Sequence, residues 1–74
     1  MPLTASALDR LSIRFKKKTL FDVSDCLAIA ATCARRGDIF GRETWLDSAI
    51  ERMQRRGISV PASIYTAYLS DLAA

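Results

Sequence analysis

The segment from Asp22 to Arg36 constrains the fold most, because it is apolar around most of its circumference when it is drawn as a helix. Its apolar residues form two adjoining stripes, with Val23, Leu27, Ala30 and Ala34 on one and Cys26, Ile29 and Cys33 on the other. The polar residues left over make a narrow edge, namely Asp22, Asp25, Thr32 and Arg36. A helix of this kind has to be covered by neighbours on several sides. We therefore expect it in the middle of the fold.

The ends of this helix and of the next carry recognisable signals. Asp22 or Ser24 suits the N-cap of the central helix, and Gly37 suits the left-handed residue that closes it. A second helix is expected over residues 42–56, and Gly57 ends it in the same way. Its core face consists of Trp45, Leu46, Ala49, Ile50 and Met53. Glu51 and Arg55 make a favourable i, i+4 pair on its outer side.

The first and last segments of the chain are shorter, and the pattern of the first fits either a helix or a strand. Leu8, Leu11 and Phe15 have helical spacing, but residues 10–16 also alternate between apolar and polar side chains, as in a half-buried strand. Helix is favoured there unless the chain pairs with a copy of itself, because no second convincing strand exists. A last helix is expected after Ser59 and Pro61. Its apolar side consists of Ile64, Tyr65, Tyr68, Leu69 and Leu72.

These elements predict an all-α fold: a small, compact bundle of three to four short helices. Residues 1–74 make one domain, with a basic N-terminal segment at 1–19 and a helical core at 20–74. The preference for Arg over Lys and the many alanines are typical of GC-rich coding, as in bacteria and phages.

The residue types present argue against catalysis and metal binding. Histidine is absent, which removes the commonest general base and metal ligand. The Cα atoms of Cys26 and Cys33 would be about 10 Å apart on a helix, too far for a disulfide. We expect two reduced, buried thiols, no cofactor, no metal, no catalytic residues and no enzymatic activity. No signal-peptide core and no membrane-spanning segment is expected, so the predicted location is the cytoplasm.

Charge is unevenly distributed along the chain. Residues 1–19 hold five basic side chains and one acidic one, a balance of +4, whereas the rest of the chain has a balance of −1. In an up-and-down bundle, the ends of the first and third helices lie at the same end of the fold. We therefore expect a basic pole made of Arg14, Lys16, Lys17, Lys18, Arg52, Arg55 and Arg56. Such a pole attracts phosphates or an acidic protein surface. The alternative is that these side chains only solubilise a turn and neutralise helix dipoles.

A second candidate contact is aromatic. Tyr65 and Tyr68 lie three residues apart on the last helix, and a tyrosine-bearing end helix is a common feature of protein interfaces. Together with the basic pole, this favours a small regulatory or accessory protein, such as an inhibitor, adaptor or subunit. Its partner would be another protein with an acidic surface, including a component of nucleic-acid-handling machinery. A homodimer is compatible with the small size of the core.

The alternative function is DNA binding by a helix-turn-helix regulator. The two helices across residues 22–56 are joined by the connection from Ile39 to Glu43. Together with the helix after Pro61, they resemble the trihelical part of winged-helix regulators. The resemblance implies base contacts from the last helix, which carries no Arg, Lys, Asn or Gln. The preceding helix presents Glu43, Asp47 and Glu51, which phosphates would repel. Protein binding is therefore ranked first.

Overall fold

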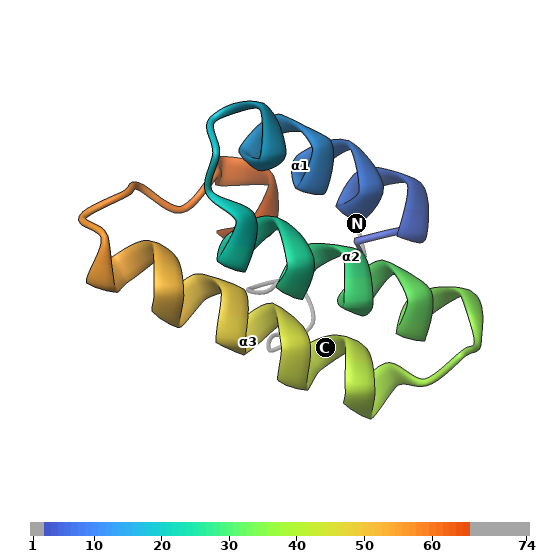
Figure 1. Cartoon of the computed structure of the whole chain (residues 1–74). Coiled ribbons are helices and arrows are strands. Elements are labelled where there is room, and N and C mark those ends of the chain that lie inside the picture. Colours follow the sequence, from blue (N-terminus) through green and yellow to red (C-terminus); the bar gives the residue numbers. More distant parts are fainter. Residues whose placement is uncertain (1–2, 66–74) are drawn as a thin grey trace.

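The computed structural model describes residues 3–65 of the 74-residue chain. They form three helices, α1 (Ala5–Lys17), α2 (Phe21–Arg35) and α3 (Ile39–Arg55), followed by a helical turn at residues 62–65 (Figure 1). The described residues contain no strand. The expected all-α fold is confirmed, and residues 10–16, whose pattern also suited a strand, are helical.

The helix α2 lies between α1 and α3 (Figure 1). It packs along both of them, whereas α1 and α3 make no comparable contact with each other. The three helices therefore form a single layer with α2 at its centre. This is the position expected for the most apolar of the three.

The two faces of this layer differ. On one face, the side chains of Val23, Leu27 and Ala30 are completely buried. The chain returns to this side after α3 and inserts Ile64, also completely buried, into the same core, which Leu3 joins from the other terminus. The other face of α2 is a stripe of five exposed residues at helical spacing, Phe21, Asp25, Ile29, Thr32 and Arg36. We call this stripe the open face.

Paired serines hold α1 close to α2. The hydroxyl of Ser12 donates to the carbonyl oxygen of Ser24 at 2.8 Å, and the hydroxyl of Ser24 donates to the carbonyl oxygen of Ser12 at 2.8 Å. The two hydroxyl oxygens are 3.0 Å apart, and both residues are buried. Small side chains permit this close approach, and their reciprocal bonds satisfy the polar atoms that it buries.

The start of α2 corrects the sequence prediction. Its N-cap is Leu20, not Asp22 or Ser24, and no side chain caps it. The turn at Thr19, which has a φ of 60°, brings the carbonyl of Leu20 into position to accept from the Ser24 amide at 2.9 Å. The helix therefore begins before both predicted caps. Their side chains bond across helices instead, to Arg56 and Ser12.

The start of α3 is also earlier than predicted, at Ile39 rather than residue 42. Asp38 caps the helix by accepting a hydrogen bond from the Gly41 amide at 2.9 Å. Gly41 is inside the helix, where a Cβ atom would lie 2.9 Å from Cys33 Sγ. The sequence pattern from residue 39 to 43 suggested a connection, because glycine is unfavourable in helices. A side chain there would meet the capping carboxylate of Asp38, which is the nearest group, as well as Cys33 of α2, and this explains why glycine stands there.

The closing glycines and the core are mostly as predicted. Gly37 and Gly57 have φ angles of 73° and 69° and follow α2 and α3, as expected. Two predicted core residues are half-exposed instead. Trp45 and Ile29 each keep 38% of their surface. Ile29 lies about 160° around α2 from Leu27, on the open face. In the last segment, helical structure begins at residue 62, so Pro61 precedes the first turn, and its carbonyl accepts from the Ile64 amide at 3.0 Å.

Candidate partner-binding surface

The up-and-down course of the helices brings three helix ends together. The end of α1, the start of α2 and the end of α3 lie at the same end of the molecule (Figure 1). An ion pair between Asp22 in the first turn of α2 and Arg56 after α3, at 3.0 Å, joins two of them directly. The expected gathering of basic residues at one end is therefore present. That this basic pole binds a partner remains a prediction.

The four cations contributed by α1 and the turn after it face solvent. Arg14, Lys16, Lys17 and Lys18 are all exposed. Within residues 3–65, none of the four makes an ion pair. Their position at the negative end of the α1 dipole gives them a structural role. Their charges nevertheless remain available to a ligand.

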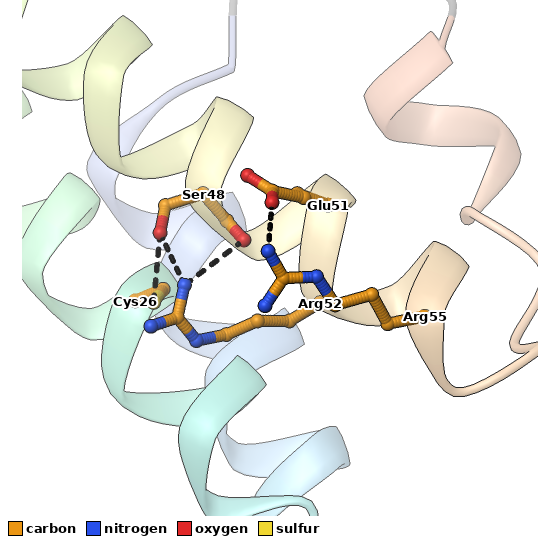
Figure 2. A network of polar contacts seen from close by, with 5 residues as sticks. All are labelled: Cys26, Ser48, Glu51, Arg52 and Arg55. Atoms are coloured by element: carbon orange, nitrogen blue, oxygen red, sulfur yellow. Dashed lines mark hydrogen bonds and ion pairs between the residues drawn. The ribbon is translucent and has the colours of Figure 1, made fainter.

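The three arginines of the pole that come from the α3 side are engaged within the protein, and Figure 2 shows two of them, Arg52 and Arg55. Arg52 points back along α3 and donates to the hydroxyl and carbonyl oxygens of Ser48, whose hydroxyl also lies 3.7 Å from Cys26 Sγ. Arg55 pairs with Glu51, the i, i+4 pair expected from the sequence. Arg56 pairs with Asp22. The α3 side of the pole is thus partly neutralised, and the α1 side is not.

Asp22 offsets the charge of Arg56 because its carboxyl group is ionised. Its partial burial favours the neutral acid, but the hydrogen bond from Arg56, backbone hydrogen bonds and attraction to the guanidinium outweigh it. The pKa of the Asp22 carboxyl is therefore lowered below its ordinary value. The carboxylate is charged at neutral pH and offsets the charge of Arg56.

The predicted aromatic contact is described only at its first member. Tyr65 is 49% exposed, directly after the completely buried Ile64. Its ring is thus available at the surface, as expected for at least one tyrosine. Tyr68 lies outside the described residues.

Sequence reasoning missed two exposed apolar side chains beside the basic pole. Ile13 and Phe21 keep 54% and 55% of their surface. A signal was present for Ile13, because it falls outside the helical stripe of Leu8, Leu11 and Phe15. Phe21 had no comparable signal, since its exposure depends on α2 beginning before Asp22.

The two cysteines of the described residues belong to no cluster of potential metal ligands. Cys26 is buried and Cys33 half-buried, both as free thiols. In residues 3–65, no group of three or more potential metal-ligating side chains comes together. No helix in this part of the chain is both long and apolar enough to cross a bilayer. Comparisons with models of protein families, with curated proteins and with solved structures found no match.

Proposed function

We propose that this chain is a non-enzymatic regulatory or accessory protein of the cytoplasm that binds an acidic surface of a partner protein through its basic pole. The observation that carries the proposal is the contrast within the pole. Arg55 and Arg56 are paired with carboxylates, whereas Lys16, Lys17 and Lys18 are exposed and make no ion pair with a described residue. Unpaired positive charge next to a neutralised region gives a directional attraction for an anionic partner. Tyr65 offers a further contact outside the pole.

The arrangement of α2 and α3 favours a protein partner over DNA. Their contacts extend along both helices, from Asp22 with Arg56, through Cys26 with Ser48, to Cys33 beside Gly41. Helices in contact over their whole length form an antiparallel hairpin, whereas the helices of a DNA-binding helix-turn-helix cross steeply. The residues expected to form the connection, from Ile39 to Glu43, belong to α3. DNA binding therefore serves as the competing outcome of the test.

The test compares two anionic probes of equal charge, a labelled glutamate-rich peptide and a labelled DNA duplex, by fluorescence anisotropy. We expect the peptide to bind more tightly, with an affinity that falls steeply between about 50 and 200 mM salt. Changing Lys16, Lys17 and Lys18 together to Glu should abolish binding while leaving the helical circular dichroism intact.

A matched pair of single variants supplies the control. Lys17→Glu and Arg10→Glu reverse one exposed charge on the same helix, but Arg10 lies two turns before Lys17 and outside the pole. Only Lys17→Glu should weaken binding. Equal losses in both variants would show that only net charge matters, and tighter binding to the duplex would support the DNA-binding alternative.

A further inference from the structure

The open face of α2 belongs to a wider apolar surface that no described residue covers. It carries Phe21 and Ile29, and it is flanked by Ile13 of α1 and Trp45 of α3. These four large side chains keep between 38% and 55% of their surface. The opposite face of the layer, by contrast, receives Ile64 and Leu3.

Contacts on either side of α2 show that the flanking residues lie level with those of the open face. Ile13 follows Ser12, and Phe21 lies three residues before Ser24, the residue that bonds Ser12. Across the other seam, Cys26 contacts Ser48 and Cys33 lies beside Gly41. Ile29 lies between the two cysteines and Trp45 between Gly41 and Ser48. Ile29 and Trp45 are therefore the middle members of two facing stripes.

Charges of both signs border this surface, and two of the acidic groups, Asp9 and Glu51, are paired with Arg35 and Arg55. Lys16 and Lys17 lie one turn beyond Ile13, and Arg36 is at the other end of the open face. Asp25 is the only acidic member of the open-face stripe. A second copy of the chain would bring two lysine-rich ends into one interface, which is unfavourable, whereas a negatively charged partner would be attracted.

We propose that the open face of α2 receives an acidic amphipathic helix from the partner protein. Phe21 and Ile29 are about 12 Å apart along the axis, or roughly two helical turns, so apolar residues spaced along one face of the incoming helix would match them. Trp45 and Ile13 would border it, and its carboxylates would meet Lys16, Lys17 and Arg36. This inference rests on the proposed function and specifies the form of the partner.

The experiment uses the full chain and two labelled peptides of about 18 residues, long enough for five helical turns. Both contain the same numbers of Glu, Leu and Ala. In one, the leucines share a helical face, and in the other their order is permuted so that no such face exists. Because charge and composition are equal, a difference in affinity reports the apolar face alone. We expect the amphipathic peptide to bind about tenfold more tightly.

Matched variants locate the contact. The double variant Phe21→Ala with Ile29→Ala should remove the preference for the amphipathic peptide and leave the weak, salt-dependent binding of the permuted one. Ile39→Ala is the control, because Ile39 is 55% exposed, like Phe21, but lies about 20° around α3 from the buried Leu46 and so on the covered side. It should leave both affinities unchanged. All three side chains are exposed, so the variants should fold, as circular dichroism can verify.

The outcomes separate this inference from the proposed function. Equal affinity for the two peptides would overturn the amphipathic-helix proposal and leave charge-driven binding standing. Absence of binding to either peptide at low salt would overturn both. A dimer in analytical ultracentrifugation that Ile29→Asp converts to monomer would show that a second copy covers the open face. Tighter binding to anionic vesicles than to the peptide, lost in the same double variant, would assign the face to a lipid surface.

Discussion

The two faces of α2 make an instructive comparison, because both carry large apolar side chains on one helix. Val23, Leu27 and Ala30 are completely buried beneath α1, α3 and the returning chain. Phe21 and Ile29 keep 55% and 38% of their surface. The apolar residues of α2 thus fall into two groups. One group packs in the core, and no described residue covers the other. Hydropathy alone does not separate them, since burial depends on which neighbours the rest of the chain supplies.

The largest expected effect comes from placing the same charge on each face. Leu27→Asp would bury an unpaired carboxylate and should cost more than about 4 kcal/mol, enough to unfold a domain of this size. Ile29→Asp, two residues away, places the carboxylate in solvent and should cost no more than about 1 kcal/mol. Thermal unfolding followed by circular dichroism measures both. Similar losses in the two variants would contradict the division into a covered and an open face.

An intermediate effect is expected where the covered face turns toward α1. Ser24→Ala removes a buried hydroxyl that donates to the carbonyl oxygen of Ser12 and lies 3.0 Å from the Ser12 hydroxyl. It leaves buried polar atoms of α1 without that partner and should lower the free energy of unfolding by about 1 to 3 kcal/mol. Urea denaturation measures the loss. Replacing both serines by alanine should cost an amount that differs from the sum of the single changes, because the two hydroxyls are in contact with each other.

The smallest effect is expected at the edge between the two faces, where Asp22 pairs with Arg56. Because the folded pKa of Asp22 is lowered, its contribution to stability is fully present above the unfolded pKa, near its ordinary value of 3.8. It is lost as the pH falls through the lower folded pKa. Asp22→Asn should therefore be less stable than the wild type at neutral pH, and the difference should shrink below pH 3.8. In an Arg56→Gln background, which lacks the partner guanidinium, the same Asp22→Asn change is the control and should give a smaller difference at neutral pH.

Sequence reasoning succeeded where local chemistry decides the structure. The glycine ends of α2 and α3, the central place of α2 and the helical spacing of Leu8, Leu11 and Phe15 all follow from residue type and period. It failed at the start of α2 and α3. Ser24 has the right chemistry for a cap, but its hydroxyl bonds across to Ser12 instead. Gly41 looked like part of a connection, yet it lies inside α3, where a side chain would meet Asp38 and Cys33.

The basic pole was likewise predictable only in part from the sequence. Its location at one end of the fold was predictable, because an up-and-down chain places the ends of α1 and α3 together. Which of its cations are neutralised was not, since the Asp22–Arg56 pair joins residues 34 positions apart. Trp45 shows the same limit. Its spacing suits the core stripe of Leu46, Ala49 and Met53, but it lies on the rim of that stripe and keeps 38% of its surface.

Residue pattern already specifies that this chain forms helices, where two of them end, and that its excess positive charge lies toward the N-terminal side. These properties follow from period, backbone preference and composition, which act over a few residues. The packing of the helices settles which face of α2 is covered, which arginines are paired and which apolar side chains remain exposed. Those outcomes depend on contacts between residues far apart in the chain, and a local sequence pattern does not specify which distant residue packs against it.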